Sequence, residues 1–531
     1  ADRRGYRAGR RRLARRKWRI NLLEELFIKE VSKKDPNFFL RLKESKYRFE
    51  DKSLMNDYIL FNDKDYTDKD YYKEYPTIYH LRSSLMTEKN PDIRKVYLAI
   101  HSILKNRGHF LLQGQSFSDS NIDSVIKELL ELDIVNIDFE VTDEVIYSLK
   151  EIALQKKNLS DKNNDVKKLY PKEKQLQEIF KLIFGGKTSL DKIYEMEEYK
   201  ELDASVKSIS FKEKVYEEVR PDYEQILSNY IELLDLAKLV YDNIVLAEIK
   251  KEGKTISESK VELYNKHKKD LENLKNLVKA DNKLSEDKKK EVYSEIFKAD
   301  IDKGTNYVNY AHKSKNGKSC SYEDFKKFLK KELEKLQDSE IKNKILGELD
   351  LETFLPLQRT KDNSVVPYQI HKEELVKILD NATKYHSFLD EKDDSGYSTR
   401  EKVVQLFEFR IPYYIGPLNA HHNTENGGYS WAIRKKGMES VPVTPWNFKD
   451  VIDESASAEA FINNLTNKCT YLAGEDVLPK NSLLYSEYAL LNELNALRYE
   501  GNRISVEARD IIVTKLFKEQ GKKVTKKTIK E

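Results

Sequence analysis

The chain has 531 residues, of which 35% are charged and 39% hydrophobic, and its formal net charge is only +4. One hydrophobic core rarely serves that length, so we expect two to four domains. Cys320 and Cys469 are too few and too far apart for a disulfide framework or a thiolate metal site. The high charge content and the helical spacing of the aliphatic residues indicate a mostly α-helical protein, and the two cysteines indicate the reducing cytoplasm. No apolar run approaches a membrane span and no signal peptide is evident.

The first predicted element is a helix rich in arginine. At 100° per residue, its cationic side chains cover more than half of the circumference and leave a narrow apolar seam. One face carries Arg4, Arg7, Arg11 and Arg15, flanked by Arg12, Arg16 and Arg19 on one side and by Arg3 and Arg10 on the other. Like charges one turn apart destabilise an isolated helix, and guanidinium groups bind phosphate with paired hydrogen bonds. The pattern indicates a helix that binds a polyanion.

A disordered basic tail or a localisation signal is the alternative interpretation of this run. The arginines, however, continue without a helix breaker into an apolar face formed by Ile20, Leu23, Phe27 and Val31. That continuity favours a helix whose second half packs on a core. Because the chain starts with Ala1 inside a basic segment and without an initiator Met, we also expect it to be a piece of a longer protein.

Helices are predicted over most of the remaining chain. Their expected positions are residues 38–42, 75–82, 93–105, 122–130, 223–251, several lysine-rich helices within 257–348, and the stretch 478–531. Asn106, Arg107 and Gly108 follow the helix at 93–105, and Asn and Gly there suit a left-handed cap. The polar residues 156–165 are expected to form a linker. Apolar and polar residues alternate in 429–434 and 441–444, and this pattern predicts a small β-hairpin.

Two clusters in this chain combine aromatic and basic residues within Pro- and Gly-rich sequence. One is residues 409–418, and the other is residues 428–436 followed by 444–448. Arginines beside flat rings can bind a sugar-phosphate backbone and stack on bases. The same residues can equally form an aromatic mini-core under a loop. The residues alone leave both interpretations open.

No catalytic or metal-binding motif is apparent in the sequence. Residues 184–188 read Phe-Gly-Gly-Lys-Thr, which resembles the end of a phosphate-binding loop. That motif requires glycine at position 181, which is lysine here, so a turn is predicted. The nine histidines are scattered and form neither an H-E-x-x-H motif nor a Cys/His box. We therefore expect no cofactor for this chain.

Several short motifs, taken in order, resemble the Cas-nine CRISPR effectors, the RNA-guided type II DNA endonucleases of antiviral defence. They are the opening helix and residues 75–82, 107–110, 367–371, 410–418, 444–448 and 478–485. The opening resembles the family's arginine-rich bridge helix, and the remainder looks like its α-helical recognition lobe. The resemblance covers nearly the whole chain but is diffuse between residues 118 and 252.

The resemblance implies roles for individual residues. Arg4, Arg7, Arg11, Arg15 and Arg19 match bridge-helix arginines that hold the seed of the guide, and Arg12 and Arg16 match others that reach the scaffold RNA. Arg3, Arg10 and Lys105 are expected to add RNA contacts, and Arg107 falls on a repeat:anti-repeat contact. Arg359, Asn363, Arg410, Tyr413 and Trp446 match positions that line the guide–target channel. Leu13 departs from the family, whose best-known members carry tyrosine there.

The resemblance also implies an organisation into domains. Expected are a bridge helix at 1–25, a first recognition domain at 26–117 and 253–466, an inserted second domain at 118–252, and a truncated third domain at 467–531. Implied partners are a guide RNA (crRNA:tracrRNA), target DNA as heteroduplex, the missing nuclease lobe and, as a candidate, a phage anti-CRISPR inhibitor. The family's RuvC and HNH nuclease parts, with their Mg²⁺, would lie outside residues 1–531, so no cleavage is expected from this chain alone.

The alternative function, of a different class, is a free-standing helical scaffold that binds structured RNA or partner proteins. RuvC-like segments on both sides of this chain in the native protein would favour the endonuclease lobe over the free-standing scaffold. In either case a bacterial, cytoplasmic protein without a membrane partner is expected.

Overall fold

The computed structural model shows a mostly α-helical chain that divides into two compact units, Ala1–Glu408 and Phe409–Glu531. The described residues are 2–43, 60–108, 110, 121–155, 157, 159–202, 207–212, 216–227, 230–298, 304–312, 320–357, 365–412, 432–438, 440–465, 474–478, 482–499 and 502–519. The predicted fold class is confirmed, since strands are confined to short two-stranded pairs within these residues. None of the helices described is both long and apolar enough to cross a membrane.

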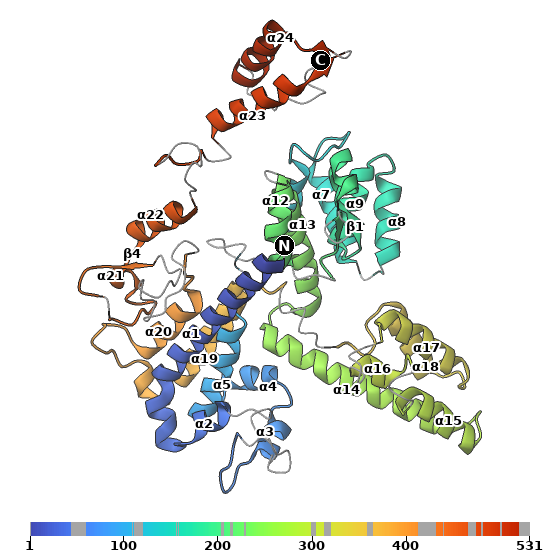
Figure 1. The fold of residues 1–531 in the computed structure, drawn as a ribbon. Helices are drawn as coiled ribbons and strands as arrows, with labels where there is room; N and C mark the ends of the chain where they lie inside the picture. The colour runs from blue at the N-terminus through green and yellow to red at the C-terminus, as the bar shows by residue number, and fades with distance from the viewer. Residues whose placement is uncertain are drawn as a thin grey trace. The chain divides into compact units, whose positions relative to one another are not determined.

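The long first helix, α1 (Asp2–Lys34), joins the arginine-rich segment to a core in one unbroken element. Leu23, Phe27 and Val31 are fully buried in its second half. They pack in a core shared with α2 (Phe38–Lys43), α3 (Asp68–Glu74), α4 (Ile78–Leu85), α5 (Ile93–Lys105), α19 (Tyr368–Ala382), η5 (Ser387–Leu389) and α20 (Thr399–Glu408). Figure 1 shows α1 lying along α5 and α20. The expected continuity of the basic and apolar halves is therefore confirmed.

Residues 121–249 build a second core from amphipathic helices. The elements are α6 (Asn121–Leu130), α7 (Asp143–Leu154), α8 (Leu159–Leu169), α9 (Lys174–Ile183), β1 (Thr188–Ser189), α10 (Leu190–Tyr194), η2 (Glu197–Glu201), β2 (Ser208–Ile209), α12 (Tyr216–Leu227) and α13 (Ile231–Ile249). β1 and β2 pair antiparallel.

Two predictions in this region were wrong. The expected linker at 156–165 contains most of α8, because Val166 is buried in the second core and the Lys162 ammonium donates to the Ala153 carbonyl at 2.8 Å. The single helix expected at 223–251 is divided between α12 and α13. Tyr230, just before α13, has non-helical dihedral angles, and its carbonyl accepts a hydrogen bond from the Tyr194 hydroxyl.

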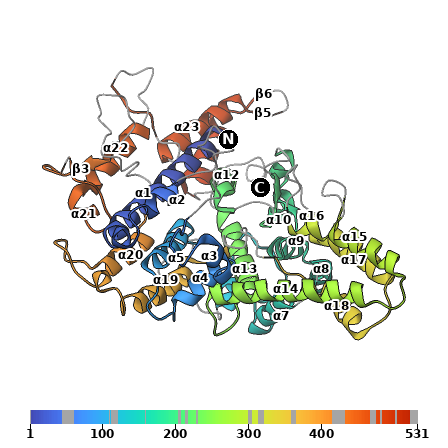
Figure 2. The same ribbon diagram turned by 90° about the horizontal axis from the view of Figure 1, so that it is seen from below.

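The lysine-rich helices predicted within 257–348 are present and surround a third core. They are α14 (Ile256–Ala280), α15 (Glu286–Phe297), α16 (Tyr307–Ala311), α17 (Tyr322–Glu334) and α18 (Glu340–Asp350). A capping box starts α14: the Thr255 hydroxyl accepts from the Glu258 amide, and the Glu258 carboxylate accepts from the Thr255 amide. Figure 2 shows α14 leading from α13 to the cluster of α15–α18. The three cores do not test the domain boundaries that the resemblance implies, and these boundaries stay predictions.

The second unit contains short elements around two small cores. They are β3 (Ile433–Arg434), α21 (Phe448–Val451), β4 (Ile452–Asp453), α22 (Glu454–Leu465), α23 (Leu483–Ala496), β5 (Arg498–Tyr499), β6 (Asn502–Arg503), α24 (Val506–Ile511) and the π-helix η8 (Ile512–Glu519). The described elements within 478–531 agree with the helical prediction, apart from the β5–β6 hairpin.

For the small β-hairpin predicted near 429–444, the prediction of the second strand was wrong. Residues 429–431 lie outside the described residues, but Ile433–Arg434 does form a strand, and it pairs with Ile452–Asp453. Residues 441–444 form no strand, because the Thr444 amide donates to the Asn447 side chain and Pro442 has no amide hydrogen. The alternation there comes from Val441 and Val443, which pack on the same small core.

Candidate nucleic-acid interface

The first half of α1 carries all nine predicted arginines on continuous helical backbone. Among the described side chains, Arg10 and Arg12 are exposed, and Arg15 and Arg16 are half-buried. The side chains of Arg3, Arg4, Arg7 and Arg11 lie outside the described residues. The helical spacing that the sequence predicted for these positions is therefore present, and the nine positions from Arg3 to Arg19 extend over about four and a half turns.

Arg19 links this row to the folded core. Its Nη2 donates to the Leu104 carbonyl at 3.3 Å, in the last turn of α5, where helix carbonyls attract a cation. Burial lowers the pKa of the Arg19 guanidinium to about 10, and the charges of Arg16 and Arg15 act in the same direction. A pKa of about 10 still leaves Arg19 protonated at neutral pH. Arg19 thus fixes the cationic half of α1 against the end of α5.

The end of α5 presents two more of the predicted cations. Lys105 is exposed in the last turn. Arg107 is half-buried, and its Nη1 donates to the Phe407 carbonyl near the end of α20 at 2.5 Å. Because Arg19 contacts Leu104, the arginine row of α1 meets the turn that carries Lys105 and Arg107.

His101 lies one helical turn before Lys105 and adds no charge to this site. Burial lowers the pKa of its imidazole to about 4, and the Lys105 charge contributes in the same direction. The imidazole is therefore neutral at physiological pH. His101 therefore adds no positive charge at neutral pH to the α1–α5 junction, where Arg19 and Lys105 lie.

The residues matched to the guide–target channel are only partly described. Arg359, Asn363 and Tyr413 lie outside the described residues. Arg410 is exposed, whereas its neighbours Phe409 and Ile411 pack on the small core around Phe448. Trp446 is half-buried in the same unit. The aromatic–basic cluster at 409–448 therefore contains a mini-core, and Arg410 lies on the outside of it.

Two groups of residues at this site were not predicted from the sequence. Arg82, Glu374, His371 and Ser257 form a buried polar network between α4, α14 and α19. Phe110 and Tyr368 stack face to face beside Arg107. The segments of Arg82, His371, Phe110 and Tyr368 were noted as family motifs, but those of Ser257 and Glu374 were not. No local pattern indicates which side chains meet across such distances in the chain.

Two kinds of motif were considered in the sequence without being given a function: the phosphate-loop-like residues 184–188 and possible metal-binding groups. The predicted turn lies between α9 and β1: Gly185 has φ +83° and the Gly186 amide closes the end of α9 on the Lys181 carbonyl at 2.8 Å. Within the described part of the chain, no group of three or more His, Cys, Asp or Glu side chains could hold a metal ion.

The fold and this site define a class: a helical lobe opened by an arginine-rich helix that is docked on its core. Two family models match the chain, the bridge helix of CRISPR-associated endonuclease Cas9 at residues 3–35 and the REC lobe of the same endonuclease at residues 124–531. The chain belongs to the Cas9 family, and the resemblance found in its motifs is confirmed.

Curated relatives agree with this assignment. The chain is 36% identical over 509 residues to the CRISPR-associated endonuclease Cas9 of Streptococcus mutans, covering 94% of this chain and 35% of that protein. It is 34% identical over 554 aligned positions to the corresponding protein of Listeria innocua, covering 100% of this chain and 38% of that protein. The chain therefore spans a little over a third of the length of these relatives.

Proposed function

We propose that this chain binds a guide RNA duplex, and the guide–target heteroduplex, as the nucleic-acid-binding lobe of an RNA-guided endonuclease. The observation that carries the proposal is the arginine row on α1, held against the end of α5 by Arg19. A helix with that charge density is stabilised by a polyanion, and arginine matches phosphate geometry. The intracellular location, the nuclease lobe as partner and an anti-CRISPR inhibitor belong to the same proposal.

In this proposal the protein recognises shape and charge, and base pairing supplies the sequence specificity. Arg4, Arg7, Arg11, Arg15 and Arg19 hold the guide seed, Arg12 and Arg16 reach the scaffold, and Lys105 and Arg107 contact the repeat duplex beside them. Cleavage is assigned to parts of the family's proteins other than residues 1–531, so this chain contributes binding alone.

Arg410→Ala tests the heteroduplex part of the proposal. Arg410 is exposed, and it lies beside the small core on which Phe409 and Ile411 pack. The substitution should leave the melting temperature nearly unchanged and weaken heteroduplex binding by about 1.5–3 kcal/mol, the range for hydrogen bonds to a charged partner. The loss should be the same for every guide sequence, because backbone contacts carry no base information.

Ile411→Ala is the matched control for Arg410, since it removes a neighbouring side chain that packs on the small core. It should cost on the order of 1 kcal/mol of stability and leave heteroduplex affinity unchanged below the melting point. A loss with Arg410→Ala that depends on guide sequence would contradict the backbone assignment. An Arg410→Ala variant that melts early and binds normally would assign Arg410 to the core instead.

A further inference from the structure

The turn after α5 is pressed against the start of α19. Gly108 in this turn has φ +80°, a left-handed conformation that favours glycine. A Cβ added at Gly108 would lie 2.3 Å from the Val366 carbonyl oxygen and 3.2 Å from Cδ2 of His371. The backbone directly after Arg107 is therefore fixed by a close approach that only glycine permits.

The Arg107 side chain is held from two further directions. Its guanidinium carbon lies 4.9 Å from the centre of the Phe110 ring, a cation–π contact. The Phe110 ring stacks on the Tyr368 ring, with centres 4.4 Å apart and planes 5° from parallel. The Arg107 Nη1 donates to the Phe407 carbonyl.

The support behind this stack is itself rigid. Tyr368 is the first residue of α19, and two turns further on Glu374 is buried and joined to Arg82 of α4 and Ser257 of α14. A stack based on a helix that is tied to two other helices keeps its orientation better than one based on a loop. The Phe110–Tyr368 pair therefore presents Arg107 from a fixed surface.

We propose that Phe110 and Tyr368 are positioning residues that orient the Arg107 guanidinium toward a phosphate of the guide RNA duplex. This inference rests on the proposed function, because it assumes that Arg107 contacts that duplex. A long arginine side chain loses rotamer freedom when it binds, and a side chain already held in the bound orientation loses less. The two aromatic rings thus increase RNA affinity without touching the RNA.

The test is a set of variants of the 531-residue chain, titrated with a fluorescent crRNA:tracrRNA repeat duplex. Arg107→Ala should weaken binding by about 10- to 100-fold. Phe110→Leu and Tyr368→Leu should each weaken it by about 2- to 5-fold, as expected for loss of a cation–π contact or of the ring behind it. Tyr368→Phe keeps the ring and should bind as the unchanged protein does.

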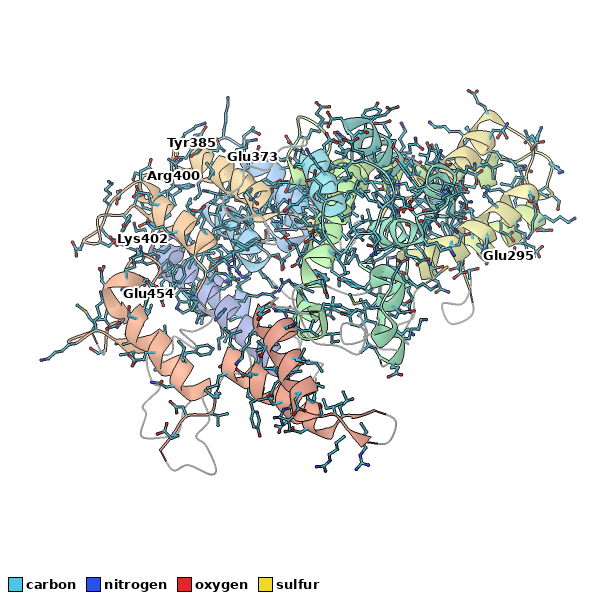
Figure 3. The ribbon with its side chains drawn as sticks, turned by 90° about the horizontal axis from the view of Figure 1, so that it is seen from above. Glu295, Glu373, Tyr385, Arg400, Lys402 and Glu454 are labelled. Carbon is cyan, nitrogen blue, oxygen red and sulfur yellow. The ribbon has the colours of Figure 1, made fainter. Side chains whose placement is uncertain are left out.

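Two further measurements separate positioning from mere stability. In the Arg107→Ala background, Phe110→Leu should have no additional effect on affinity, because the rings act only through Arg107. Tyr385→Leu removes an exposed tyrosine beyond the end of α19, labelled in Figure 3, and should change neither affinity nor melting temperature. Affinities are compared below the melting point of every variant.

The outcomes distinguish this inference from the proposed function. If Arg107→Ala binds the duplex normally, the contact assigned to Arg107 is wrong and the positioning role is overturned with it. If Arg107→Ala weakens binding but the leucine variants do not, the positioning role alone is overturned. The same holds if Tyr368→Phe loses affinity, or if Phe110→Leu weakens the Arg107→Ala variant further. Should Tyr368→Leu fail to fold, Phe110→Leu and the double variant decide the matter.

Discussion

Glu374→Ala is expected to lower the free energy of unfolding of the first unit by about 3–5 kcal/mol, the cost of removing one partner of a buried ion pair. The Glu374 carboxylate is 1% exposed and pairs with the Arg82 guanidinium, which is 5% exposed. It also accepts hydrogen bonds from the Ser257 amide at 2.6 Å and the Ser257 hydroxyl at 2.9 Å. Without the carboxylate, the Arg82 charge stays buried and loses its ion pair with Glu374.

Glu373→Ala is the matched control, since Glu373 precedes Glu374 on α19 and lies on the outside (Figure 3). Its carboxylate pairs with Lys377 at 2.6 Å, but both side chains are about half exposed. An exposed pair contributes about 0–1 kcal/mol, so this variant should unfold almost as the unchanged protein does. The comparison is made by urea unfolding followed by circular dichroism. Equal midpoints for the two variants would contradict the buried network.

Salt should weaken guide RNA binding steeply. If α1 neutralises about six phosphates, the logarithm of the binding constant should fall against the logarithm of salt concentration with a slope of roughly −4 to −5. Affinity would then drop by several hundred-fold between about 50 and 200 mM salt. Arg11→Ala with Arg15→Ala keeps the helix, because alanine is the best helix former, and should flatten the slope by about one to two units.

A double change of equal charge in the second half of α1 provides the control for this experiment. Lys29 and Lys33 are exposed on the same helix but lie beyond the arginine row, and Lys33 pairs with Glu30. Replacing both with alanine should leave the slope unchanged. A slope near zero, or one that the arginine changes leave untouched, would mean that α1 is not the RNA contact. Equal flattening by the arginine and lysine changes would mean that α1 attracts RNA only through general charge.

Sequence patterns sufficed where a helix carries its own periodicity and its own ends. Residues 93–105 were predicted as a helix, and the structure has Ile93–Lys105, because its apolar side chains repeat and Asp92 caps its first turn by accepting from the Arg94 amide. The arginine-rich helix was predicted for the same reason. By contrast, α8 is polar along most of its length, and only packing through Val166 and Lys162 reveals why it is a helix.

The candidate site also has one part that the sequence predicts and another part that only the tertiary structure reveals. The arginines of α1 share a face because helical geometry places them there, so the sequence alone could predict the row. Arg82 and Glu374 are 292 residues apart, and no local pattern predicts that they meet. The Phe110–Tyr368 stack depends in the same way on α5 and α19 lying side by side. Residues that hold the binding side chains in place therefore emerge only from the tertiary structure.

Competition between two RNA duplexes of equal length tests the central claim most directly. One is a crRNA:tracrRNA-type guide duplex, the other an unrelated duplex with the same number of phosphates, and both are titrated against the 531-residue chain at fixed salt. Equal phosphate counts cancel the nonspecific charge term, so any preference must come from the shape to which α1 and the Arg107 turn are fitted. We expect the guide duplex to bind at least about tenfold tighter, which corresponds to about 1.4 kcal/mol. Equal affinity for the two duplexes would contradict the assignment of this chain as a guide-binding lobe.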